Sequence, residues 1–240
     1  MAITFIQKTP DTVGSDAGGG TSIQGTAFTA SVTTGNYVYV FFTQYRTGAT
    51  PDEPVFTDTG SNTYEIIVTA TGTNNRATIA RSLIATGGAL RITASITNTD
   101  YHNLGCIEVS SDESLVEADT ESGSGSSTAP ATAQLDRTGD GIYFGLACWN
   151  STVEITPPAS WTEIHVNESW ADANIDSCYY IDSGNKTPTW ALASSGVWVA
   201  VSAVFYENAG GSVIPIIYSL SDSTIINGQT GINILGSNFN

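Results

Sequence analysis

Short apolar or alternating segments recur along almost the whole chain. Tyr37–Phe42 is apolar without interruption, which predicts a central strand covered on both faces. Tyr64–Thr69 and Leu90–Ile96 instead alternate apolar and polar residues, the pattern of strands with one exposed face. The same reading predicts further strands at Ala77–Ala85, Leu104–Val109, Gly141–Trp149, Trp161–Val166, Ile175–Ile181, Thr189–Ala193 and Val197–Tyr206.

Turn-forming residues separate these strands, as at Thr59–Asn62, Thr86–Gly88 and Asp182–Asn185. A brief helical turn is expected only at Asp112–Ala118. About a dozen strands without a long helix predict an all-β fold. We expect an antiparallel β-sandwich, jelly-roll-like, with two pseudo-repeated halves.

The two halves follow from a repeated series of strands. Thr34–Asn36 and Thr138–Asp140 are similar turns, and each precedes a central strand that is followed by three more strands. We therefore interpret residues 1–207 as one β-sandwich domain in which each half supplies strands to both sheets and cannot cover its own apolar face. Two small sandwiches, each with little core, are the alternative.

Two stretches are interpreted as linkers. Glu121–Pro130 is rich in Ser and Gly, and its composition predicts a connection too polar to pack. The second linker, residues 208–213, contains Ala209-Gly210-Gly211 and separates the sandwich domain from residues 214–240.

Charge and composition narrow the function classes. The net charge of −16 opposes binding to nucleic-acid phosphates or to anionic lipid, so neither nucleic acid nor membrane is an expected partner. The start Met1–Lys8 alternates like an edge strand and does not resemble a signal peptide. No stretch approaches the roughly 18 apolar residues of a membrane helix. We therefore expect a product kept in a cytoplasm or released from it by lysis.

The three cysteines fit that expectation. Cys106, Cys148 and Cys178 each lie inside an apolar strand, where a thiol behaves as a small hydrophobic group. Their number is odd and no CxxC spacing occurs. Buried free thiols are predicted, with one disulfide as the alternative.

Several turn motifs resemble those of a β-sandwich module found in phage virion proteins and bacterial extracellular proteins. They are Gly35–Val40, Asp58–Tyr64 and Thr86–Gly88, and the string Pro157–Thr162 resembles the P-x-G-W-T turn of the second half of that module. Ala159-Ser160 departs from that turn. The resemblance covers about 170 residues and implies a fold more than a role.

A second resemblance lies at the C-terminus. Ile214–Ser221 and Asn227–Phe239 are similar to the opening of an IPT/TIG immunoglobulin-like domain, with Gly231 in place of the usual Val. Only about a third of such a domain is covered, which would leave apolar strands exposed. Either the natural chain continues, or these strands complete a sheet in a neighbouring subunit.

No catalytic residue, cofactor or enzymatic activity is predicted. His102 falls in an apparent turn, and His165 on the outward phase of an alternating strand, so both are read as exposed surface. The sequence contains neither GxSxG nor HExxH. The acidic pairs Asp112/Glu113 and Glu117/Asp119 would suit a glycosidase only if a cleft joined them.

Calcium and sugar are the two candidate ligands. Asp58–Asn62 and Asp136–Gly141 place oxygen atoms on tight turns, but side-chain hydrogen bonds within the turns explain both, and no metal site is predicted. Of the five tryptophans, Trp149 and Trp198 are expected in the core. Trp170 is the best candidate for an exposed ring, and so the candidate ligand contact.

These observations lead to a functional hypothesis. The chain is expected to be a non-catalytic structural protein of a phage virion: a capsid decoration, head-fibre or tail-associated subunit that docks on the particle and displays a stalk. Its expected partners are capsid or tail proteins, further copies of itself, and a host-surface glycan. Its expected location is the virion, after synthesis in the host cytoplasm. The alternative is a carbohydrate-binding or adhesive module on a bacterial cell surface.

Overall fold

The structure is a computed structural model that describes residues 3–10, 20–167 and 173–208. Within these ranges every regular element is a β-strand, which confirms the predicted all-β class. The strands are β1 (Thr4–Lys8), β2 (Gly20–Gln24), β3 (Tyr37–Tyr45), β4 (Val55–Asp58), β5 (Glu65–Thr71), β6 (Asn75–Leu83), β7 (Ile92–Ser110), β8 (Ser114–Ser127), β9 (Asp140–Trp149), β10 (Ile155–Thr156), β11 (Thr162–Asn167), β12 (Ile175–Ser183), β13 (Ala191–Leu192) and β14 (Gly196–Asn208).

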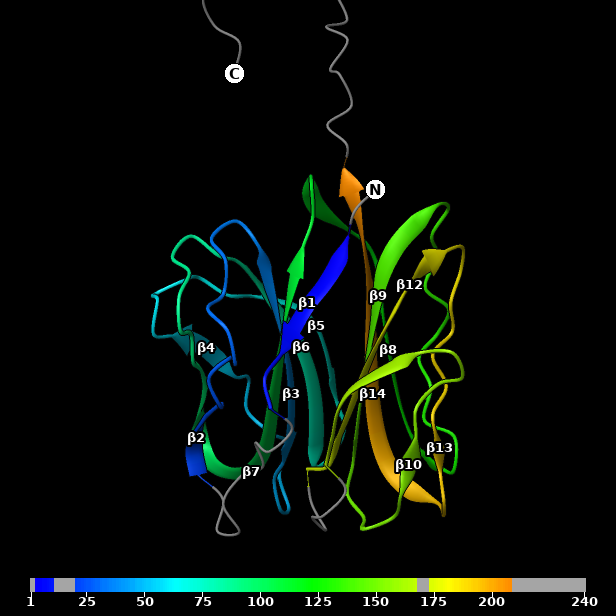
Figure 1. The fold of residues 1–240 in the computed structure, drawn as a ribbon. Coiled ribbons are helices and arrows are strands. Elements are labelled where there is room, and N and C mark those ends of the chain that lie inside the picture. Colours follow the sequence, from blue (N-terminus) through cyan, green and yellow to red (C-terminus); the bar gives the residue numbers. More distant parts are fainter. Residues whose placement is uncertain (1–2, 11–19, 168–172, 209–240) are drawn as a thin grey trace, which may run out of the picture. The chain divides into compact units, whose positions relative to one another are not determined.

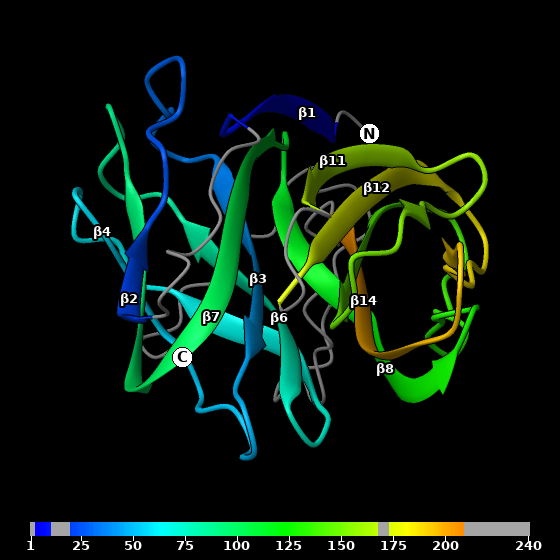
Figure 2. The same cartoon turned by 90° about the horizontal axis from the view of Figure 1, so that it is seen from below.

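Two antiparallel sheets face each other as a sandwich (Figures 1 and 2). The first sheet has the strand order β1-β7-β3-β6-β5, and β2 and β4 pair with the first part of β7. The second sheet has the order β11-β12-β9-β14-β8. A small β10-β13 ladder lies beside the second sheet (Figure 1).

Aromatic rings join the two sheets across the inner core. The Phe144 ring of β9 lies 4.4 Å from the Tyr39 ring of β3, between ring centroids, and 5.7 Å from the Phe41 ring. Phe205 of β14 lies 6.0 Å from Phe144. All four side chains are buried. Such edge and tilted contacts add to the stabilisation that comes from burial.

Each sheet is also covered on its outer face, which explains why the central strands are apolar throughout. Val40 and Phe42 of β3 pack outward against Phe56 of β4 and neighbouring residues. The outer face of the second sheet packs against Trp190 and Leu192, on and beside β13. The prediction that Tyr37–Phe42 is covered on both faces is confirmed.

The two halves of the chain have the same strand order but different sheets. In the first sheet, the four strands β3, β5, β6 and β7 lie side by side in the order β7-β3-β6-β5. In the second sheet, the four corresponding strands β9, β11, β12 and β14 lie in the equivalent order β14-β9-β12-β11. The expectation that each half supplies strands to both sheets is therefore wrong. The fourth strand of each series pairs with the first strand of the same series, so each sheet is completed within one half. The inner faces then cover each other.

The predicted linker Glu121–Pro130 and the predicted helical turn Asp112–Ala118 are both wrong, because β8 runs from Ser114 to Ser127. It pairs with β14 along its whole length. A Cβ at Gly125 would lie 2.9 Å from Cζ2 of Trp198, so glycine is what lets the indole lie against this strand. The Trp198 Nε1–H donates to the Ser127 hydroxyl at 3.0 Å. The Ser and Gly residues that predicted a linker therefore let β8 pack against Trp198.

Strand β7 joins two segments that the pattern predicts as separate strands, Leu90–Ile96 and Leu104–Val109. The polar residues between them interrupt the apolar alternation, yet Asp100 and Asn103 are buried. The short strands β2, β4 and β10 carry too few apolar residues to be predicted. The N-terminal segment does form an edge strand, β1, as expected.

The cysteines are buried free thiols, as predicted. Burial raises the pKa of Cys148 to about 12, and burial likewise raises the pKa values of Cys106 and Cys178. Because the thiolate is the reactive form, these thiols are inert near neutral pH.

Both chain ends of the described sandwich lie at one end of it, which we call the exit end. Thr4 pairs with Ser110, and Asn208 pairs with Ser114 across the turn that joins β7 to β8. The opposite end, the loop end, contains the segments 45–54, 72–74 and 150–154. Residues 209–240, with most of the predicted linker and the whole Ig-like segment, lie outside the described residues. No helix in the described part of the chain is long and apolar enough to span a membrane.

Candidate functional site

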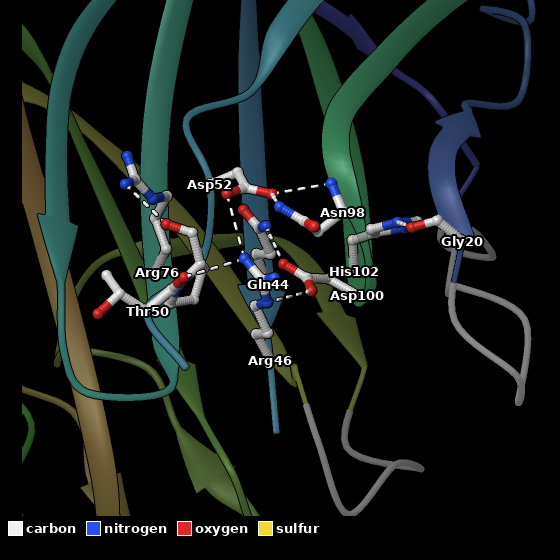
Figure 3. Close-up of polar contacts among 10 residues, drawn as sticks. Gly20, Gln44, Arg46, Thr50, Asp52, Arg76, Asn98, Asp100 and His102 are labelled. Carbon is white, nitrogen blue, oxygen red and sulfur yellow. Dashed lines mark hydrogen bonds and ion pairs between the residues drawn. The ribbon is translucent and has the colours of Figure 1, made fainter. Parts of the chain in front are cut away.

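A buried polar cluster lies at the loop end, on the outer face of the first sheet (Figure 3). Asp100 of β7 and Gln44 of β3 are at most 2% exposed. The Gln44 side-chain amide donates to Oδ2 of Asp100, and the Arg46 Nε lies 3.5 Å from Oδ1. Burial raises the pKa of Asp100, while Gln44 and Arg46 act in the opposite direction. The cluster thus holds a carboxylate where water does not solvate it.

Asp52 extends this cluster onto the loop that follows β3. Its Oδ2 accepts from the backbone N–H of Asn98 at 2.8 Å and from the Asn98 amide at 2.7 Å, and its Oδ1 accepts from Arg46 at 3.2 Å. The Arg76 guanidinium donates to the Pro51 carbonyl at 3.0 Å. These bonds tie the loop to β6 and β7. The Asn98 side chain makes the largest contribution that lowers the pKa of Asp52.

The substitution Asp52→Asn is expected to lower the free energy of unfolding at pH 7 by about 1 kcal/mol, because a charge-assisted acceptor is lost. The lowered pKa means that Asp52 stabilises the fold above pH 3.8, and that this contribution disappears as the pH falls through the lowered value. Urea unfolding between pH 7 and pH 2.5 measures both effects. Glu53→Gln, at an exposed neighbour, is the matched control. If Asp52→Asn lowered the free energy of unfolding by the same amount at every pH in this range, the stabilising role of the ionised Asp52 carboxylate would be contradicted.

The expectation that His102 lies in an exposed turn is wrong. His102 is on β7 and only 2% exposed, and its Nε2 lies 3.0 Å from the Gly20 carbonyl oxygen. The imidazole stacks on Phe42, with 5.9 Å between ring centroids. The polar stretch that resembled a turn is the middle of the long strand β7.

The expectation that His165 faces outward is also wrong. A register shift between Glu163 and His165 in the β11–β12 pairing turns the ring inward, and the residue is 4% exposed. Its Nε2 lies 3.2 Å from the Thr9 hydroxyl and 3.0 Å from the Thr9 carbonyl oxygen. Its Nδ1 lies 3.4 Å from the Ser177 hydroxyl. His165 therefore connects Thr9, in the segment after β1, to the second sheet. Because Ser177 is fully buried, the pair of His165 and Ser177 is not accessible to a substrate.

The two aspartate turns are held by side-chain hydrogen bonds. Asp58 accepts from the backbone N–H groups of Gly60 and Asn62 at 2.8 and 3.0 Å, and from the Tyr64 hydroxyl at 2.9 Å. Asp136 accepts from the Asn185 amide at 2.9 Å. These bonds agree with the turn interpretation. Within residues 3–10, 20–167 and 173–208, no group of three or more His, Cys, Asp or Glu side chains is placed to hold a metal ion.

The acidic pairs occupy two different places. Asp112 and Glu113 lie in the turn between β7 and β8, where the Asp112 N–H donates to Glu207 at 3.1 Å. Glu117 and Asp119 lie on β8. Asp119 accepts from the backbone N–H of Asp136 at 2.8 Å. Desolvation raises the pKa of Glu117.

Trp149 and Trp198 are buried, as predicted. Trp190 is also buried, and its Nε1–H donates to Asp176 at 2.9 Å. Trp161 is half-buried and stacks on Tyr180, with 6.0 Å between centroids. Trp170, the candidate ligand contact, lies outside the described residues.

The residues on both sides of Trp170 that the structure describes are held firmly. The Ala173 carbonyl accepts from the Thr43 hydroxyl at 3.1 Å and from the Asn103 amide. Asn167 donates to the Asn103 side-chain oxygen at 3.0 Å. Hydrogen bonds from the first sheet therefore fix the described end of β11 and the start of the segment that leads into β12.

Comparison with known proteins found no matching family model, no similar curated protein and no similar solved structure.

Sequence reasoning missed the cluster around Gln44 and Asp100, although one signal for it exists. Along β3 the outward positions are Val38, Val40 and Phe42, and Gln44 continues the same phase. A single polar residue in an otherwise apolar phase requires a buried hydrogen-bonding partner. The sequence alone does not identify that partner, because Asp100 is 56 residues away.

Proposed function

We propose that the protein is a non-catalytic structural subunit of a phage virion, such as a capsid decoration, head-fibre or tail-associated protein. In this proposal the loop end docks on the particle, and the chain that follows Asn208 is displayed from the exit end. The observation that carries the proposal is the position of Thr4 and Asn208 at one end of the sandwich. The loop end is thereby left available to a partner.

The hydrogen bonds of the loop end support a docking role. Asp52 and Arg76 fix the loop after β3, and an inter-sheet hydrogen bond joins the Asn75 amide to the Val197 carbonyl at 3.5 Å. A surface that is already ordered loses less conformational entropy on binding. A stable contact of this kind needs roughly 800 Å² from each partner.

The acidic composition and the turn motifs support the virion setting. A net charge of −16 favours solubility and keeps neighbouring copies apart at high local concentration. The turns at Asp58–Tyr64 and Pro157–Thr162 resemble those of a module found in phage virion proteins and in bacterial extracellular proteins, and Asp58 organises the first of them.

Immunogold electron microscopy tests this function. An antibody raised against the purified chain is applied to intact particles and to cells of the bacterium that produces the protein. Gold on particles is the expected result. Labelling confined to the bacterial envelope would favour the alternative, an adhesive surface module. Protein found only in the soluble fraction would contradict both.

A further inference from the structure

A hollow of about 540 Å³ lies on the outer side of β8 and β14, near the exit end. Its lining includes Glu117, Asp136, Arg137, Thr138, Asn185 and Tyr206. Tyr206 pairs with Val116, close to the final pair of the strand, Asn208 with Ser114. This volume lies within the range of small-molecule sites, roughly 300–1,000 Å³.

Arg137 is held in a defined orientation beside this hollow. Its guanidinium carbon lies 4.0 Å from the centroid of the Tyr206 ring, a cation–π contact. Its backbone N–H donates to the Asn185 side-chain oxygen at 2.9 Å, and its Nη2 lies 3.4 Å from the Asp140 carbonyl oxygen. A guanidinium has five N–H donors, and the contacts within the described residues use few of them. The Nε of Arg137 is buried, so the donors that it can offer to a ligand are those of its terminal Nη atoms.

The acceptors of the hollow are also fixed before any ligand binds. Oδ1 of Asp136 accepts from Gln134 at 2.8 Å and from the Asn185 amide at 2.9 Å. Carboxylates accept hydrogen bonds, the Thr138 hydroxyl both donates and accepts, and a guanidinium only donates. The lining of the hollow thus contains both hydrogen-bond donors and hydrogen-bond acceptors.

The charges of the hollow select among ligand classes. Glu117 and Asp136 contribute two negative charges and Arg137 one positive charge, which leaves a net charge of −1 on the lining. With the −16 of the whole chain, this field opposes an anionic ligand such as a phosphate or a sialylated sugar. A neutral sugar matches both sets of groups, because each hydroxyl can donate to a carboxylate and accept from the guanidinium or an amide.

We propose that this hollow binds a neutral sugar residue of a surface glycan. The proposal deepens the proposed function in one respect: if the loop end docks on the particle, the hollow faces outward with the exit end. It differs from the sequence-based expectation, which placed the ligand contact at Trp170.

The test is a glycan array of neutral and acidic oligosaccharides probed with the full 240-residue chain. Calorimetric titration with the best free neutral oligosaccharide then compares variants. Arg137→Ala is expected to weaken binding about tenfold or more, because it removes the oriented charged donor. Arg91→Ala, which removes an exposed arginine on the first sheet, is expected to stay within about twofold. Thr138→Val, at an exposed position, is expected to weaken binding several-fold and serves if Arg137→Ala misfolds.

Three results would overturn the inference: no neutral glycan bound, a preference for acidic glycans, or unchanged affinity in Arg137→Ala and Thr138→Val. The array is independent of the immunogold experiment. Gold on particles without glycan binding would remove this inference and leave the virion role intact. Glycan binding without gold on particles would remove the virion role and leave the glycan inference intact.

Discussion

Replacing Phe144 with alanine is expected to lower the free energy of unfolding by about 3–5 kcal/mol. Phe144 is fully buried and lies within 6.0 Å of the rings of Tyr39, Phe41 and Phe205, measured between centroids. Its removal leaves a cavity between the sheets that rigid backbone strands cannot close. Denaturant unfolding, followed by tryptophan fluorescence, measures the loss.

Leu83→Ala is the matched control for that experiment. Leu83 is on β6 and 57% exposed, so its truncation is expected to change stability by about 0.5 kcal/mol or less. If Phe144→Ala cost no more than Leu83→Ala, the two sheets would not share the core described here.

Adding a single methyl group at Gly105 is expected to destabilise the protein by about 2–3 kcal/mol. A Cβ at this position would lie 2.5 Å from Nδ1 of His165 and 2.7 Å from its Cγ. The ring has no easy way to move aside, because Thr9 and Ser177 contact its two nitrogens. The substitution Gly105→Ala must therefore shift β7 away from the second sheet or break these contacts. Thermal and denaturant unfolding measure the effect.

A double-mutant cycle separates this collision from a general loss of glycine. His165→Ala removes the ring, so the double variant is expected to be about 1–2 kcal/mol more stable than the sum of the single effects. Gly20→Ala on β2, where the nearest atom to a new Cβ is 3.4 Å away, is expected to be nearly neutral. Simple additivity in the cycle would contradict the packing of His165 against Gly105.

The sequence predicts the strands of this fold well wherever burial alone decides them. The segments around Tyr37–Phe42, Gly141–Trp149 and Val197–Tyr206 are apolar because both faces are covered, and each forms a central strand. The repeat also predicts the matching series of strands. It does not predict the sheets, because the same pattern fits strands that pair within one half or between halves.

The errors occur where the partner of a residue is far away in the chain. Glu121–Pro130 appeared too polar to pack, but its glycines accommodate Trp198 from a strand about 70 residues later. His165 appeared exposed because alternation assumes a regular strand, and the register shift in β11 breaks the alternation. Neither the contact with Trp198 nor the shift leaves a local signal. The same holds for the site at Asp100, whose buried carboxylate depends on Gln44 of β3 and on Arg46, the first residue after that strand.

The separation of the halves into two sheets has a consequence for assembly. Strands β1 to β7 belong to the first sheet, whereas β8, β9, β11, β12 and β14 form the second sheet and β10 and β13 form the small ladder beside it. Within the described residues, the chain therefore crosses from the first sheet to the second at residues 111–113. Opening that one hinge would let two copies exchange entire sheets while every inner face regains its native contacts. The topology thus permits an intertwined dimer with the same interior as the monomer, and the rigidity of a three-residue turn decides between them.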